Sequence, residues 1–133
     1  NFFLERRRKN AEYLTENLKR FEAIETPHVK PHVMHSFNQY TVKLRIERLN
    51  CSRDEFADAL RAENVGSAVH YPRPLHLQPV FRDLLHTKKD MCPVSLELAE
   101  RVLSLPVHPA LTRTDLENIC LAVEKVIEKY SKR

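Results

Sequence analysis

Apolar side chains recur every three or four positions near the start of the chain, which predicts a helix over residues 3–21. The residues expected on its buried face are Leu4, Ala11, Leu14, Leu18 and Phe21. Pro27 and Pro31 cannot continue a helix, because proline lacks the backbone donor and restricts the residue before it. The segment around these two prolines is therefore expected to be extended or irregular.

A strict alternation of apolar and polar residues begins at Tyr40, which is typical of a strand with one face on a core. The apolar positions are Tyr40, Val42, Leu44 and Ile46. Residues 67–70 are short, β-compatible and followed by Pro72, so we expect a brief strand there. Residues 103–107 are apolar but contain Pro106, which predicts a strand or an extended connector.

Two capping-box patterns mark expected helix starts, one from Ser52 to Glu55 and one from Thr112 to Asp115. The buried stripes expected in these helices are Phe56, Ala59 and Leu60 in the first, and Leu116, Ile119, Cys120, Val123, Ile127 and Tyr130 in the second. Asn64 and Gly66 can adopt left-handed conformations that would end the first helix. Pro93 is expected to open a further helix, with Leu96, Ala99 and Val102 as its apolar positions.

Helices and short strands alternate along the chain, and no repeat of long apolar strands with crossover helices is visible. This order predicts an α+β fold, with a small, mostly antiparallel sheet of about three or four short strands covered by helices. A length of 133 residues fits one domain that spans residues 1–133.

The composition restricts the class of protein further. Apolar residues make up 42% and charged residues 30%, with no long uncharged apolar run, so we expect no membrane span or signal peptide and a cytoplasmic location. Cys51, Cys92 and Cys120 are widely spaced and odd in number, which predicts reduced, mostly buried thiols. One glycine in the whole chain excludes a glycine-rich phosphate loop.

Charge and histidine content suggest two further kinds of site. The net charge of +4 and the basic run at residues 6–9 allow phosphate binding, but on a helix such a run is typically a solvated or interface face. No aromatic interleaving favours a nucleic-acid partner, and we expect none. His28, His32 and His35 would converge on a helix, but Pro31 breaks it, so no metal site is expected.

The candidate for molecular recognition is HYPRPLHLQP, residues 70–79, which contains three prolines. The prolines reduce the entropy that the loop would lose on meeting a ligand. If the loop is extended, its polar groups face one way and its apolar groups the other, so that His76 and Gln78 share a face. Hydroxyl, imidazole and amide groups suit sugar hydroxyls or phosphate oxygens. The alternative is a stiff connector whose Tyr71 and His76 only satisfy buried backbone groups.

Three segments carry a resemblance to a known family: the R-x-x-N-A-x-Y-L helix from Arg7, HYPRPLHLQPVF at 70–81 and LSLPVHPALTRTDLENI at 103–119. Together they resemble the C-terminal small domain of sugar-nucleotide aminotransferases of the DegT/DnrJ/StrS type, pyridoxal-phosphate enzymes of aminotransferase fold type I. The resemblance implies a dimeric parent enzyme that moves an amino group, usually from glutamate, onto a nucleotide-linked keto-sugar in cell-surface polysaccharide or amino-sugar biosynthesis. The substrate-binding residues that it implies are Tyr71, His76, Gln78, His70 and Arg73.

The family's Schiff-base lysine and its pyridine-binding aspartate belong to an N-terminal cofactor domain, and neither motif is present here. The resemblance therefore implies that the chain has no catalytic residue of its own, binds no pyridoxal phosphate alone and works with that second domain. The competing interpretations are a stand-alone module that binds sugar nucleotides without catalysis, and a nucleic-acid binder that uses the basic helix.

Overall fold

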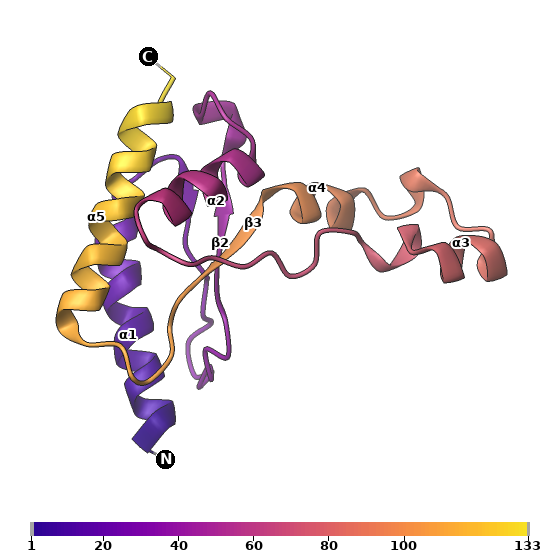
Figure 1. Cartoon of the computed structure of the whole chain (residues 1–133). Coiled ribbons are helices and arrows are strands. Elements are labelled where there is room, and N and C mark those ends of the chain that lie inside the picture. The colour runs from indigo at the N-terminus through magenta and orange to yellow at the C-terminus, as the bar shows by residue number, and fades with distance from the viewer. Residues whose placement is uncertain (1, 133) are drawn as a thin grey trace.

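The structure is a computed structural model that describes residues 2–132. Helix α1 (Phe2–Leu18) and helix α5 (Arg113–Tyr130) run side by side along one side of the molecule, and α2 (Arg53–Ala62) also packs against α5. Figure 1 shows these three helices beside a small sheet. The apolar stripe predicted for α5 is buried, except that Tyr130 is only half-buried.

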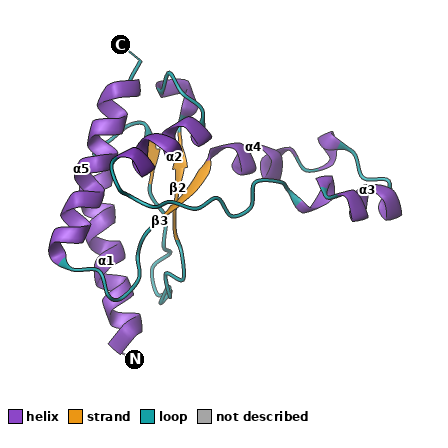
Figure 2. Ribbon diagram, in the orientation of Figure 1, coloured by secondary structure: helices purple, strands orange, loops and turns teal. Residues whose placement is uncertain are grey.

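The sheet has three antiparallel strands in the order β1 (Ile24–Glu25), β2 (Tyr40–Leu44) and β3 (Val102–Leu105) (Figure 2). Val42 pairs with Leu103 at the centre of the ladder between β2 and β3. Alternate residues of β2 are buried, as the period of two predicts. The α+β class with a small antiparallel sheet is therefore confirmed.

One hydrophobic core lies between the sheet and the helices. Its largest fully buried side chains are Tyr40, Phe56, Leu14, Leu18, Leu44, Leu60, Leu103, Val42 and Val123. Burial raises the pKa of Tyr40 to about 12, although a hydrogen bond of 2.9 Å with the Thr15 hydroxyl acts in the opposite direction. No buried member of the core cluster falls between Val65 and Leu103, and of the residues between them only Val69 packs against the cluster.

Several element ends differ from the sequence expectations. Helix α1 ends at Leu18, and Phe21 packs on the core from the turn that follows. The alternation after β2 stops at a 3-10 turn, η1 (Ile46–Arg48). The strand expected at 67–70 is reduced to a single pairing of Ala68 with Ser104, because the chain then turns away from the sheet.

Both capping boxes are confirmed. The backbone N–H groups of Ser52 and Thr112 each donate to the carboxylate three residues later, at 2.7 Å. The backbone N–H and the hydroxyl of Ser52 hold the pKa of Glu55 below its usual range, because their hydrogen bonds stabilise the charged form. The hydroxyl and the backbone N–H of Thr112 lower the pKa of Asp115 in the same way. Asn64 has the left-handed conformation expected at the end of α2, but Gly66 does not have a positive φ.

Residues 70–101, which we call the arm, project from the remainder of the described chain, which we call the body (Figure 1). The arm contains η2 (Leu75–Leu77), α3 (Pro79–Leu85), η3 (Lys89–Met91) and α4 (Pro93–Arg101). Only His76 and Ala99 are buried within it. Its large exposed apolar side chains are Tyr71, Leu75, Val80, Phe81, Leu84, Leu85, Met91, Val94 and Leu98.

The three cysteines are free thiols, but the expectation that they are mostly buried is wrong. Cys120 is buried in α5, Cys51 is half-buried and Cys92 is exposed, because it lies in the arm just before α4. Among residues 2–132, no helix has the length and apolar character needed to span a lipid bilayer.

Candidate functional site

A hollow of about 760 Å³ lies where the arm joins the body, and we call it the arm hollow. The loop that precedes α3 forms one side of it, and α4 with the start of β3 forms another. The lining residues are His70, Tyr71, Arg73, Pro74, Leu75, His76, Gln78, Cys92, Ser95, Leu98, Ala99 and Val102. All five residues that the sequence singled out therefore border one concave surface.

The polar groups of the loop differ in how far they are already engaged. Tyr71 is 77% exposed, and in the described chain neither its hydroxyl nor the side chains of Arg73 and Gln78 form a hydrogen bond. Most of the remaining lining is apolar, including Leu75 and Leu98. An apolar surface with a few unpaired polar groups is the usual composition of a site for a small organic ligand.

His76 has a partly structural role. It is only 9% exposed, its Nε2 lies 3.4 Å from the carbonyl oxygen of Lys89, and its own carbonyl accepts a hydrogen bond from the Thr87 hydroxyl. These contacts tie η2 to the segment that returns towards α4. His76 thus satisfies a backbone group, as the connector interpretation expects, and also borders the arm hollow.

The prediction that polar and apolar side chains alternate along an extended loop at 70–79 is wrong at the centre of the loop. Residues 75–77 form a 3-10 turn, in which Leu75 is exposed and His76 is buried. A 3-10 helix repeats every three residues, so the period of two cannot persist through it. His76 and Gln78 still line the same hollow, but through the turn and not through a shared strand face.

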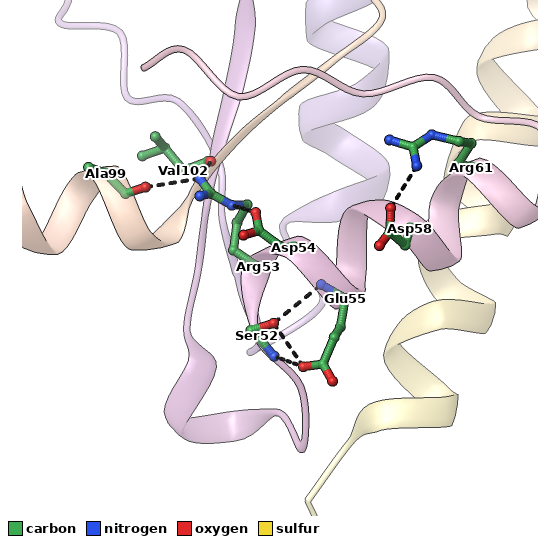
Figure 3. Close-up of polar contacts among 8 residues, drawn as sticks. All are labelled: Ser52, Arg53, Asp54, Glu55, Asp58, Arg61, Ala99 and Val102. Carbon is green, nitrogen blue, oxygen red and sulfur yellow. Dashed lines mark hydrogen bonds and ion pairs between the residues drawn. The ribbon is translucent and has the colours of Figure 1, made fainter. Parts of the chain in front are cut away.

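The base of the arm is fixed to the body by a buried arginine that the sequence reasoning missed. Arg53, at the start of α2, is 7% exposed and donates from one guanidinium nitrogen to the carbonyl oxygens of Ala99 and Val102, each at 3.0 Å (Figure 3). Its Nε donates to Asp54. Arg53 therefore links the capping-box end of α2 to the junction of α4 and β3, which lines the arm hollow.

Two ion pairs support the same junction from the side of β2 and η1. Lys43 lies 3.1 Å from Glu97, and Arg101 lies 2.8 Å from Glu47. Glu97 and Arg101 occupy one side of α4, whereas Leu98 and Ala99 border the hollow. The charged residues of α4 thus orient the helix so that its small and apolar residues complete the site.

The histidines do not gather into a metal site. Within residues 2–132, no three histidine, cysteine, aspartate or glutamate side chains come close enough together to hold an ion. His28, His32 and His35 lie in the irregular segment around Pro31, and the Nδ1 of His35 accepts a hydrogen bond from the backbone N–H of Phe37.

Comparison with known proteins places this geometry in a family. The profile of the DegT/DnrJ/EryC1/StrS aminotransferase family matches residues 1–124. The chain belongs to this family. It is 34% identical over 124 residues to an uncharacterized protein, MJ1066, from Methanocaldococcus jannaschii, with 93% of this chain and 32% of that protein covered.

The chain is also similar to a protein with a named activity and to a solved structure. The UDP-N-acetyl-3-dehydro-alpha-D-glucosamine 3-aminotransferase of Acidithiobacillus ferrooxidans is 34% identical over 121 residues, which cover 91% of this chain and 30% of that protein. The crystal structure of DesV from S. venezuelae, in complex with a ketimine intermediate, matches with a TM-score of 0.83 and 26% identity, covering 93% of this chain and 32% of DesV. The chain spans about a third of the length of these relatives.

Aminotransferases of this family depend on pyridoxal phosphate, but the residues of the arm hollow do not fit that cofactor. A Schiff base requires a lysine, and the pyridine nitrogen requires a carboxylate partner. Among residues 2–132, neither a lysine nor a carboxylate lines the arm hollow. Lys43 of β2 forms an ion pair with Glu97, and Lys125 of α5 forms one with Glu63. The residues that line the arm hollow therefore include groups that can bind a ligand and none that would hold the cofactor.

Proposed function

We propose that residues 1–133 form the C-terminal substrate-binding domain of a pyridoxal-phosphate-dependent aminotransferase that acts on a nucleotide-linked keto-sugar. In this proposal the loop at 70–79 binds and orients the sugar nucleotide, and a second domain supplies the lysine. The observation that carries the proposal is the arm hollow, in a chain of this family, with Tyr71, Arg73 and Gln78 unpaired around an apolar wall.

The chemistry of the hollow suits such a ligand. A phenol, a guanidinium and an amide provide both donors and acceptors for sugar hydroxyls and phosphate oxygens. Leu75 and Leu98 provide an apolar surface for the faces of a sugar or a base. His76 holds the 3-10 turn in place through the carbonyl of Lys89, so the loop is ordered before a ligand arrives. Such preorganisation lowers the entropy lost on binding.

The exposed apolar side chains of the arm also support the proposal that a second domain is the partner of this chain. Leu84 and Leu85 of α3 are exposed, as is Val80 of the same helix. Apolar side chains gathered on one projecting element are typical of an interface. We propose that the arm packs on the lysine-bearing domain of the enzyme, in a cytoplasmic homodimer.

A second candidate function is a stand-alone module that binds sugar nucleotides without catalysis. It is favoured by one observation, which is that none of the described residues that line the arm hollow is a lysine. The two candidates differ in what the chain does alone and in what it does with a lysine-bearing domain.

Calorimetric titration of the chain with a UDP-linked N-acetylated sugar tests the loop. Saturable binding is expected, and Gln78→Ala should weaken it by roughly tenfold through the loss of one hydrogen bond to a polar ligand group. His76→Ala should weaken it by a similar factor, because it releases the 3-10 turn that presents the loop. His28→Ala is the matched control, because His28 is exposed and lies outside the arm hollow. Binding that is unaffected by both loop substitutions would remove the assigned role of the loop.

Transamination separates the two candidates. With a lysine-bearing large domain supplied as a second polypeptide, glutamate and a nucleotide-linked keto-sugar should yield the amino-sugar, and His76→Ala should raise the KM for the sugar more than it lowers kcat. If the chain binds the sugar nucleotide but no large domain restores turnover, the stand-alone module is the correct candidate.

A further inference from the structure

The four basic residues at 6–9 do not form a uniform solvated face, because two of the arginines are used inside the fold. Arg6 donates to the carbonyl oxygens of Pro109 and Leu111, at 3.3 and 3.2 Å. The Nε of Arg8 donates to the carbonyl oxygen of His35 at 2.9 Å. Both side chains therefore hold loops against α1, and this structural role accounts for them.

Arg7 lacks such an explanation. Within residues 2–132 its only hydrogen bond is a long one, 3.5 Å from a guanidinium nitrogen to Oδ1 of Asn38, and no carboxylate forms an ion pair with it. Its Nε is shielded from solvent and has no acceptor. A guanidinium carries five N–H donors, and a buried donor without a partner costs about 1–3 kcal/mol. A half-buried, uncompensated cation of this kind calls for an acceptor that the described chain does not provide.

The side chain of Arg7 lines a second hollow of about 350 Å³, which we call the Arg7 hollow. His70, His108 and Ser67 line it as well, together with the amides of Asn38 and Gln39. None of its lining residues is an aspartate or a glutamate. A concave surface with one permanent cation, several neutral donors and no acidic group favours an anion.

We propose that the Arg7 hollow is a binding site for a small oxyanion, in which Arg7 provides the charge and Asn38, Gln39 and Ser67 provide further hydrogen bonds. The shared chemistry is that of a phosphate or a carboxylate group with several oxygen acceptors. Arg rather than Lys suits this role, because its planar fork can bind two oxygens of one group. The site is distinct from the arm hollow, since His70 is the one lining residue that the two have in common.

The test uses inorganic phosphate and glutarate, a dicarboxylate without an amino group, as separate probes at constant ionic strength. Each is titrated into ¹⁵N-labelled chain while the Nε–H signal of Arg7 and the amide signals of Asn38, Gln39 and Ser67 are followed by NMR. We expect a saturable shift of these signals with at least one probe. The probe that saturates at the lower concentration identifies the phosphate or the carboxylate as the source of the oxyanion.

Substitutions then assign the binding to the guanidinium. Arg7→Gln should weaken it by roughly tenfold or more, the loss expected for a charge-assisted hydrogen bond, and Arg7→Lys should restore part of it. Lys9→Gln is the matched control, since Lys9 is an exposed cation two residues away that lies outside the Arg7 hollow. The shifts in the unsubstituted chain do not depend on how well Arg7→Gln folds.

The proposal is overturned if neither probe gives a saturable shift at these four residues, or if the shifts persist in Arg7→Gln. These results are independent of the proposed function. A failed oxyanion site leaves the titration of His76→Ala and Gln78→Ala with a sugar nucleotide unaffected, and a failed sugar-nucleotide site leaves the phosphate and glutarate titrations unaffected.

Discussion

The body and the arm of this chain are stabilised in different ways. The body encloses a continuous core in which Phe56 is 1% exposed, and capping boxes begin two of its helices. The arm contributes no residue to that core, and Leu84 of α3, the helix at the far end of the arm in Figure 1, is 72% exposed. The difference shows that a buried core stabilises the body, whereas the arm leaves most of its large apolar side chains exposed.

The largest expected effect contrasts one large apolar residue from each region. Phe56→Ala should lower the free energy of unfolding by about 3–5 kcal/mol, because it leaves a cavity in the core. Leu84→Ala should change it by less than about 0.5 kcal/mol, as an exposed side chain has little packing to lose. Urea denaturation followed by circular dichroism measures both. A large loss with Leu84→Ala would mean that the arm packs on the body.

The junction of the two regions should show the next largest effect. Arg53→Met removes two hydrogen bonds and leaves the carbonyl groups of Ala99 and Val102 unpaired, at a cost of about 1.5–3 kcal/mol. Amide hydrogen exchange should accelerate in α4 more than in α5. Arg61→Met is the control, because Arg61 makes only an exposed ion pair with Asp58 (Figure 3). Equal effects of the two substitutions would argue against Arg53 as the anchor of the arm.

The caps of the body should have a smaller effect. Thr112→Ala removes the acceptor for the Asp115 backbone N–H and should cost about 1 kcal/mol. Thermal unfolding of the variant and of the unsubstituted chain measures the difference. A substitution at Lys88, which precedes η3 in the arm, should leave the melting temperature unchanged.

The pH dependence of stability follows from the same caps. The folded pKa of Glu55 and of Asp115 is lower than the unfolded value, so their contribution is complete above the unfolded pKa. It is lost as the pH falls below about 4 towards the folded pKa values. Melting temperatures measured through this range should therefore fall, and the fall should be smaller in a variant with both Glu55→Gln and Asp115→Asn.

The smallest expected effect concerns one hydrogen bond inside the core. Tyr40→Phe keeps the packing of the ring and removes its hydrogen bond with Thr15, at a cost of about 1 kcal/mol or less. Since burial raises the folded pKa of Tyr40 from 10.0 to about 12, its contribution is present below pH 10 and lost as the pH rises towards 12. The variant should therefore lose less stability than the unsubstituted chain on alkaline titration.

The parts of the fold that follow from local rules could be predicted from the sequence. Alternation placed β2, and the capping boxes placed the starts of α2 and α5, because these patterns report on the chain's own backbone and core. The 3-10 turn at Leu75–Leu77 could not be predicted, since Thr87 and Lys89 stabilise it from ten or more residues away. The anchoring role of Arg53 likewise depends on carbonyl groups 46 and 49 residues along the chain.

The residues of the arm hollow also divide into those that the sequence indicated and those that only the fold brings together. The residue types of the loop indicated Tyr71, His76 and Gln78 as a group, and the structure brings them to one hollow. The opposite wall comes from Ser95 and Leu98 of α4 and from Cys92 just before it, and this segment carries a helix-start signal at Pro93 but no recognition motif. The sequence could not distinguish Arg7 from the other arginines of the basic run. Only the folded structure shows which arginine side chains have carbonyl partners and which does not.

The most direct test of the central claim is amide hydrogen exchange over the whole chain, alone and with a lysine-bearing aminotransferase domain added. In the chain alone, α3 and η3 should exchange quickly while β2, β3 and α5 are protected. The added domain should slow exchange in the arm selectively. Two results would contradict the proposal that the arm binds this domain. One is protection of the arm in the isolated chain that equals protection of the body, and the other is unchanged exchange in the arm after the domain is added.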